Sequence, residues 1–246
     1  MENKNRGRCF HLVMACVFLG LALAGFGRSY WLKLVDGSFD RPPIYHVHGA
    51  LMTAWFALYV VQAWQVRRGR MQRHRDWGLA GIALLTLVLC TMFALTLHGM
   101  GRDFSLAGNH VEALQLPVAS LVSILLAGVL FAFAIANIRR PEAHKRLMLM
   151  LMVVLVQAAV ARLVVLPLMK GPPTPAAIIP TALVTDLLLL AALLRDWIVD
   201  RRVHVAYLVG APLTVAAQLL AAPFGGSTAG IAIGSALMGL MGRPPA

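Results

Sequence analysis

Histidines stand at the ends of long apolar runs in this sequence, where their imidazoles could bind a metal or a cofactor. The stretch IYHVHGALM, residues 44–52, places His46 and His48 at the start of one run. His98 ends the next run and His110 begins the one after it. If each run is a membrane-spanning helix, all four imidazoles lie at the same level of the membrane. Imidazole nitrogens ligate iron, copper and zinc, so these histidines are candidate ligands.

Two further histidines define a second level on the other side. His74 and His144 begin the third and fifth apolar runs. In an antiparallel bundle, helices two and four can lie diagonally, as can helices three and five. His46 or His48 would then bracket an outer site with His110, and His74 would bracket another site with His144. Two bis-histidine sites stacked across a membrane suit electron transfer through two b-type haems, which neutral imidazoles ligate axially.

Charged residues inside or beside the apolar runs add to the outer set. Arg162 lies roughly 9 Å from the outer end of the fifth run, at 1.5 Å per residue, and Asp186 lies at a similar depth in the sixth. A lone buried charge is costly, so we expect an ion pair between them. Alternatively, Arg162 holds a substrate anion or a haem propionate. Glu112, two residues after His110, is a candidate to orient an imidazole or to ligate a metal.

Small residues accompany two of the histidines on their helix faces. Residues three, four and seven positions apart share a face, which places Gly49 beside His46 and Gly78 beside His74. Such faces leave room for a flat macrocycle, or they pack closely against another helix. His46 and His48 are two positions apart and point in different directions on a helix, so we do not expect both to bind one metal unless the helix begins after His48.

Three functions are compatible with these residues. The first is a b-type haem protein that moves electrons between a quinone or periplasmic donor and another redox centre, with haem b held by His46, His48, His74, His110, His144 and Arg162. The second is a metal-binding protein or metalloenzyme that holds copper, zinc or iron through His46, His48, His98, His110 and Glu112. The third is a transporter or lipid-binding protein without a cofactor. The sequence leaves open whether the chain is an enzyme and how many copies assemble.

The elements that must position these side chains are membrane-spanning helices. Of the 246 residues, 59% are hydrophobic and 13% are charged, whereas soluble domains have an apolar share of about 45–50%. Runs of about 20 apolar residues, enough to cross ~30 Å of hydrocarbon, recur along the chain. The spans lie approximately at 10–30, 46–66, 77–98, 111–137, 147–168, 178–194 and 204–222. We therefore predict an all-α, polytopic bundle of about seven spans.

The chain is expected to form a single transmembrane domain over residues 1–246, with its functional core in 44–168. The glycine-rich segment 225–246 is expected to form a short helix or a re-entrant hairpin. Within it, Gly226, Gly230 and Gly234 are four positions apart, which allows close helix approach.

Charge predicts the orientation. The N-terminal segment and the three loops on the same side hold 15 of the 22 Lys and Arg residues, which places the N-terminus in the cytoplasm. This distribution also accounts for the net charge of +12 without a nucleic-acid partner; membrane lipid is the expected neighbour of these loops. The three cysteines, Cys9, Cys16 and Cys90, show no paired or CxxC spacing.

Two resemblances follow from these motifs. The segments HVHG, RHRDWG, EAHKRLMLM and ARLVVLP resemble a family of uncharacterised bacterial multi-pass proteins; the matching residues are His46, His48, Gly49, His74, Arg75, Gly78, His144, Lys145, Arg146 and Arg162. This resemblance implies a bacterial inner-membrane protein. The alternation of histidines over residues 44–150 is similar in topology to the di-haem transmembrane b-type cytochromes. That second resemblance implies haem b, with a quinone or a redox protein as partner.

Overall fold

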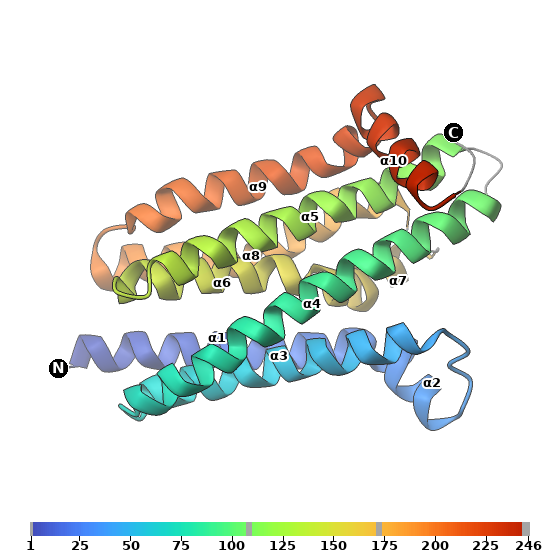
Figure 1. Ribbon diagram of the computed structural model, residues 1–246. Coiled ribbons are helices and arrows are strands. Elements are labelled where there is room, and N and C mark those ends of the chain that lie inside the picture. Colours follow the sequence, from blue (N-terminus) through green and yellow to red (C-terminus); the bar gives the residue numbers. More distant parts are fainter. Residues whose placement is uncertain (1, 107–109, 171–173, 243–246) are drawn as a thin grey trace. The chain divides into compact units, whose positions relative to one another are not determined.

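The computed structural model describes residues 2–106, 110–170 and 174–242, and side chains within 9–101, 114–170 and 174–242. The described residues form helices and no β-strand (Figure 1). The long helices are α1 (Glu2–Phe26), α3 (Pro43–Arg67), α4 (Met71–Leu106), α5 (His110–Ala136), α6 (Pro141–Val160), α8 (Ile178–Asp200) and α9 (Val205–Gly225). The short elements are η1 (Gly27–Trp31), α2 (Leu32–Val35), η2 (Ala161–Val165), α7 (Leu166–Met169), η3 (Pro175–Ala177) and α10 (Thr228–Leu240).

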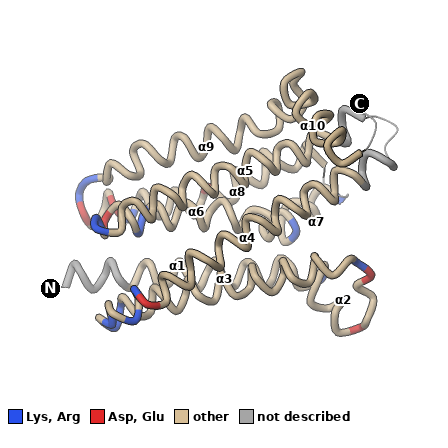
Figure 2. The backbone as a smooth tube through the Cα atoms, in the orientation of Figure 1, with Lys and Arg blue, Asp and Glu red and all other residues tan. Residues whose placement is uncertain are grey.

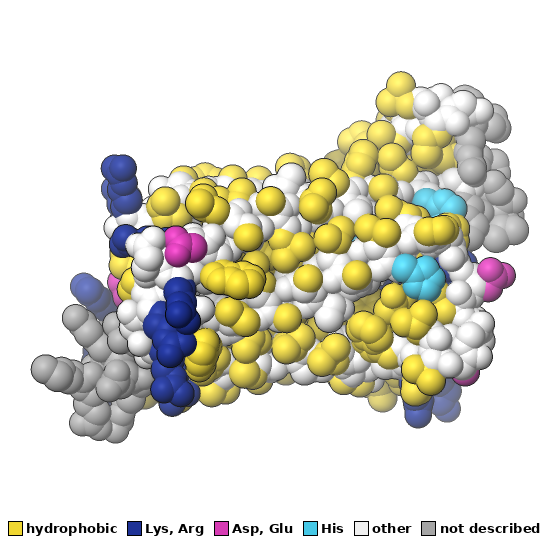
Figure 3. Space-filling model, turned by 60° about the horizontal axis from the view of Figure 1, so that its bottom comes forward, with side chains coloured by type: hydrophobic (Ala, Val, Ile, Leu, Met, Phe, Trp, Pro, Cys, Tyr) yellow, Lys and Arg dark blue, Asp and Glu magenta, His cyan; other side chains and the backbone are white. Residues whose placement is uncertain are grey.

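Seven helical segments among the described residues are long and apolar enough to cross a membrane, which confirms the polytopic fold. They run over Cys9–Val35, Pro43–Arg67, Met71–Gly101, Leu114–Ala136, Pro141–Met169, Pro175–Asp200 and Val205–Gly225. Lys and Arg gather at helix ends (Figure 2). Apolar side chains cover the helix surfaces between those ends, as a lipid-facing surface requires (Figure 3).

Most helices extend beyond the predicted apolar runs. The helix containing His144 begins at Pro141, and the helix containing His46 begins at Pro43. Proline suits the first helical turn because its missing N–H has no partner there. Long basic side chains and histidines at these ends reach toward the headgroups while their backbone stays helical. The charged residues therefore mark the ends of the apolar segments, and the helices themselves continue past them.

The chain divides into two compact units. The first contains residues 1–92 together with 158–163, and the second contains 93–157 together with 164–246. The predicted functional core, 44–168, therefore draws on both units, and the assignment of one domain stays a prediction.

In the first unit, α1 packs along α3, and α3 packs against the first part of α4. A Cβ atom added at Gly25 of α1 would collide with the backbone of Ala159, so the two backbones approach closely there. Gly81 of α4 faces Leu58 and Trp55 of α3 in the same way. Glycine thus serves helix packing in this unit.

In the second unit, α5 and α8 each pack against α9, and salt bridges tie α6 to α8 (Figure 1). Residues 149–156 of α6 are all apolar and buried. Gln115 of α5 donates a 2.9 Å hydrogen bond to the carbonyl of Ala222 in α9, which fixes the register of these two helices.

The glycine-rich end of the chain forms a short helix, as one of the two alternatives predicted. The helix α10 has 13 residues and is therefore about 20 Å long, which is too short to cross ~30 Å of hydrocarbon. Ser227 caps it by accepting a hydrogen bond from the backbone of Gly230. A Cβ at Gly230 would collide with the carbonyl of Phe224, and one at Gly234 would press on Leu114. The close approach predicted from the spacing is confirmed at these two glycines.

Two π-helical segments interrupt the α-helical ladders of the first and fifth spans. One is η1, which follows Phe26, and the other is η2, which follows Val160. Single π turns of this kind occur mostly within α-helices and frequently at functional sites. Here they carry Tyr30 and Arg162, respectively.

Candidate functional site

His48 is held in one orientation by Thr91. The Nδ1 atom of His48 lies 2.9 Å from the hydroxyl of Thr91, which joins α3 to α4 within the first unit. The Thr91 hydroxyl also lies 3.0 Å from the carbonyl of Leu87 and 2.9 Å from that of Val88, and a carbonyl can only accept. The hydroxyl proton is thus used locally, so the oxygen accepts from His48. The neutral ring therefore carries its proton on Nδ1 and has its lone pair on Nε2.

No hydrogen bond joins Nε2 of His48 to any described residue. An imidazole that donates through one nitrogen and offers the other is the arrangement of metal-ligating histidines. It is equally suited to accept a hydrogen bond from a hydroxyl group. His48 is therefore the candidate ligand whose surroundings best define its chemistry.

Arg162 adds a positive charge to the same unit. Its guanidinium donates a 2.8 Å hydrogen bond to the carbonyl of Ala158 and lies over the ring of Phe26, 4.7 Å from the ring centroid. It is close enough to act electrostatically on His48. Within the first unit, no described carboxylate forms a salt bridge with Arg162. A cation inside a membrane-spanning segment that uses only a carbonyl and an aromatic ring is suited to bind an anion.

His46 has a different setting from His48. Its ring contacts Phe39 edge-on at 5.0 Å between centroids, and its Nδ1 lies 3.3 Å from the hydroxyl of Tyr30. A Cβ at Gly49 would lie 3.2 Å from the Tyr30 ring. The space beside Gly49 thus receives Tyr30, so the helix-packing alternative fits this glycine better than a macrocycle does. Since α3 begins at Pro43, both histidines are helical and their side chains diverge.

The cytoplasmic pair of predicted ligands is distributed over both units. His74 belongs to the first unit and His144 to the second. The Nδ1 atom of His144 lies 2.8 Å from the carbonyl of Ala134 and therefore donates to it. Gly78, on the face of His74, lies beside the side-chain amide of Gln62, which donates to the carbonyl of His74. The pairing of His74 with His144 stays a prediction.

The outer partners of His48 are described only in part. His98 lies in the second unit, whereas His46 and His48 lie in the first. The side chains of His110 and Glu112 lie outside the described residues. Within the described part of the chain, no three His, Cys, Asp or Glu side chains are grouped as a metal site. The outer cluster of four histidines and Glu112 stays a prediction.

A network of charged side chains, which the sequence reading did not identify, ties α6 to α8. Arg146 and Asp196 are each 2% exposed, and the Arg146 Nε donates to Asp196 at 2.6 Å. The other Arg146 nitrogens donate to Glu142 at 2.6 Å and to Asp200 at 3.3 Å. Arg195 bridges the two aspartates at 3.0 and 2.6 Å. Glu142 and Arg146 are four residues apart, as are Asp196 and Asp200, so each pair lies on one helix face. This spacing is the feature of the sequence that indicates the network.

This network changes the interpretation of the motif His144-Lys145-Arg146. The motif offers cations at a helix N-terminus, where an external phosphate or propionate is one expected ligand. In the structure, Lys145 lies 2.7 Å from the carboxylate of Glu142, and Arg146 is surrounded by carboxylates of the chain. The anions at this helix end are therefore internal.

Asp186 belongs to a polar chain in the second unit. With the Gln218 amide oriented to satisfy both neighbours, its nitrogen donates to the Asp186 carboxylate at 3.0 and 3.2 Å. Its oxygen accepts from the amide of Gln157 at 2.8 Å. The predicted ion pair of Asp186 with Arg162 would join the two units and stays a prediction. Gln218 and Gln157 thus supply the hydrogen bonds that a buried carboxylate requires.

Compared with known protein families, with curated proteins and with solved structures, the chain matches none of them.

Proposed function

We propose that this chain is a b-type haem protein of the bacterial inner membrane that transfers electrons between a quinone or periplasmic donor and another redox centre. The orientation of His48 carries the proposal: the Thr91 hydroxyl accepts a hydrogen bond from Nδ1–H, which leaves the Nε2 lone pair for a ligand. A neutral imidazole oriented in this way has the chemistry of an axial haem ligand.

Arg162 supports the same assignment. Haem b carries two propionates, and a guanidinium binds carboxylates with charge-assisted hydrogen bonds. Arg162 acts electrostatically on His48 and forms no salt bridge with a described carboxylate of the first unit. Both Arg162 and Tyr30 lie in π-helical turns, which is typical of functional positions. We assign the propionate contact to Arg162.

The remaining predicted residues have defined places in the proposal. In this proposal His110 would supply the second ligand of the outer haem, and His74 and His144 would hold a second haem toward the cytoplasmic side. Bound haem supplies one-electron redox chemistry. Thr91 would fix the tautomer of the ligand His48, and Arg162 would balance the propionate charge.

The absorbance spectrum of the purified full-length protein, produced with sufficient haem, tests the proposal. We expect a Soret band in the wild-type protein and loss of about half of the bound haem in His48→Ala, since the second site, proposed at His74 and His144, keeps its own haem. The matched control is His46→Phe, which keeps an aromatic ring against Tyr30 and Phe39 and should retain the haem of the wild-type protein.

Two results would overturn this proposal. One is a wild-type protein without a Soret band; the other is equal haem content in the two histidine variants. Metal analysis of the same sample distinguishes the alternative with an outer metal ion, which predicts copper, zinc or non-haem iron at a ratio near one per chain.

A further inference from the structure

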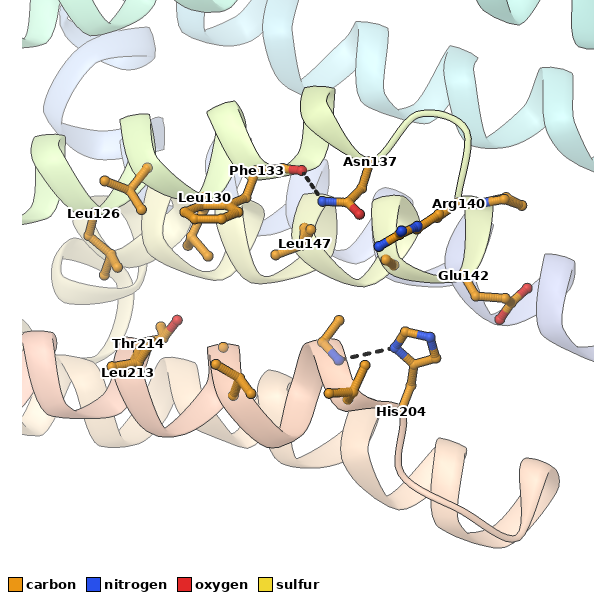
Figure 4. A pocket seen from close by; sticks show the side chains of 17 residues that line it. Leu126, Leu130, Phe133, Asn137, Arg140, Glu142, Leu147, His204, Leu213 and Thr214 are labelled. Carbon is orange, nitrogen blue, oxygen red and sulfur yellow. Dashed lines mark hydrogen bonds between the residues drawn. The ribbon is translucent and has the colours of Figure 1, made fainter.

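A groove in the second unit runs between α5, the start of α6 and α9 (Figure 4). Its volume is about 640 Å³, which lies within the range of ligand pockets in proteins. All of its lining residues belong to the second unit, and none belongs to the site proposed for haem.

Most of the groove is apolar and open to the membrane. Leu126 and Leu130 of α5 line one wall, and Leu213 of α9 lines the other (Figure 4). Val209 and Phe133, which also line it, are 57% and 58% exposed although they lie in membrane-spanning helices. Side chains exposed at this depth face lipid, so the groove is accessible to an acyl chain without passage through water.

The mouth of the groove is polar and lies at the basic helix ends. Arg140 lines it, and no described carboxylate forms a salt bridge with Arg140. Glu142 also lines it, but its carboxylate is paired with Lys145 and Arg146. The charge that remains for a ligand at the mouth is therefore positive. From Leu126 to the end of α5 at Ala136 the chain advances 10 residues, or about 15 Å at the α-helical rise, so the groove extends over about half of the hydrocarbon thickness.

His204 supplies a hydrogen-bond donor at the same mouth. Its Nδ1 accepts a 3.1 Å hydrogen bond from the backbone N–H of Ala206, so the neutral ring carries its proton on Nε2. Burial and the nearby charge of Arg146 lower the pKa of His204, which keeps the ring neutral at pH 7. A guanidinium and an imidazole N–H beside an apolar groove match a phosphate attached to an acyl chain.

We propose that the groove binds one acyl chain of an anionic phospholipid, whose phosphate is held by Arg140 and by the Nε2–H of His204. The occupant is a lipid because the apolar walls open to the membrane, and it is anionic because Arg140 is the cation at the mouth that no carboxylate of the described chain neutralises. The site is independent of the haem proposal.

Lipid retention measured by native mass spectrometry tests the headgroup assignment. The full-length protein is reconstituted in nanodiscs of equal phosphatidylglycerol and phosphatidylcholine, extracted in mild detergent, and measured for the lipid that stays bound. We expect about one phosphatidylglycerol per chain in the wild-type protein and at least a fivefold loss in Arg140→Gln. Arg139→Gln removes the same charge one residue away, outside the groove, and should change retention by less than twofold.

A second pair of variants tests the acyl-chain assignment. Val209→Trp fills the groove, whereas Leu208→Trp adds the same ring at a residue that is 60% exposed and does not line it. Val209→Trp should lose the retained lipid and Leu208→Trp should keep it. Equal loss in Arg140→Gln and Arg139→Gln, equal retention of the zwitterionic lipid, or full retention in Val209→Trp would each overturn the proposal. None of these measurements depends on haem.

Discussion

At the scale of single residues, the structure separates histidines that the sequence presents as a doublet. His46 belongs to an aromatic cluster with Tyr30 and Phe39, whereas His48 donates to Thr91 and keeps Nε2 available. The sequence reveals that both side chains lie at a helix start. It does not reveal the partner, since Thr91 is 43 residues away and a threonine in an apolar helix can bond its own backbone instead.

Removal of Arg146 should strongly destabilise the protein. This residue is buried with Asp196, and removing one partner leaves an uncompensated buried charge, which destabilises by about 3–5 kcal/mol. We therefore expect Arg146→Met and Asp196→Leu each to lower the thermal unfolding temperature in detergent strongly. The double variant Arg146→Met/Asp196→Leu should lose less stability than the sum of the two single variants.

Lys145→Met is the matched control, because it removes a cation of the same network whose side chain is 29% exposed. Exposed ion pairs contribute about 0–1 kcal/mol. If Lys145→Met lowered the unfolding temperature as much as Arg146→Met, the burial of the Arg146–Asp196 pair would not be what stabilises this region.

At the scale of helices, close approach depends on glycines that have no room for a side chain. Gly25 touches the backbone of Ala159, whereas Gly20, on the same helix, has no atom within 4 Å of the position of an added Cβ. Both glycines lie in α1, but an added methyl group would collide with a neighbouring helix only at Gly25. They make a direct comparison of packing against helix propensity.

Gly25→Ala should therefore destabilise the protein, since the added methyl group forces α1 away from the backbone at Ala159. Gly20→Ala should be neutral or stabilising, by up to about 1 kcal/mol, because alanine favours helix over glycine. Thermal unfolding of both variants in one detergent measures this difference. Equal unfolding temperatures would mean that α1 shifts at no cost.

The helices differ in how far their sequence predicts them. Hydrophobicity predicts seven spans, and seven are found among the described residues, because membrane hydrocarbon selects about 20 apolar residues in each. The π turns at Gly27–Trp31 and Ala161–Val165 have no such signature. Their hydrogen bonds depend on what packs against the helix, and this information is distributed over distant parts of the chain.

At the scale of the whole molecule, charge sets the expected direction of insertion. The excess of Lys and Arg in the N-terminal segment and three loops predicts that these face the cytoplasm, with residues 36–42 on the other side. The buried Arg146 network does not weaken this expectation, because acidic residues contribute little to orientation.

Cysteine labelling measures the orientation directly. In a variant whose three native cysteines are replaced by alanine, Ser38→Cys should react with a membrane-impermeant maleimide in intact cells. Gln72→Cys, which is also exposed at a helix end, should react only after the membrane is permeabilised. The reverse pattern would place the N-terminus outside the cytoplasm.

The two π turns also determine how many residues the first and fifth spans contain. A π turn closes over one residue more than an α turn, so each of these helices contains a single-residue surplus. A chain that lost one residue within Gly27–Trp31, or within Ala161–Val165, would close a regular ladder there and leave the rest of the helix in its place. Deleting one residue at either position would thus reorient Tyr30 or Arg162 without interrupting the membrane-spanning helix. The orientation of these two side chains is therefore sensitive to a change of one residue in chain length.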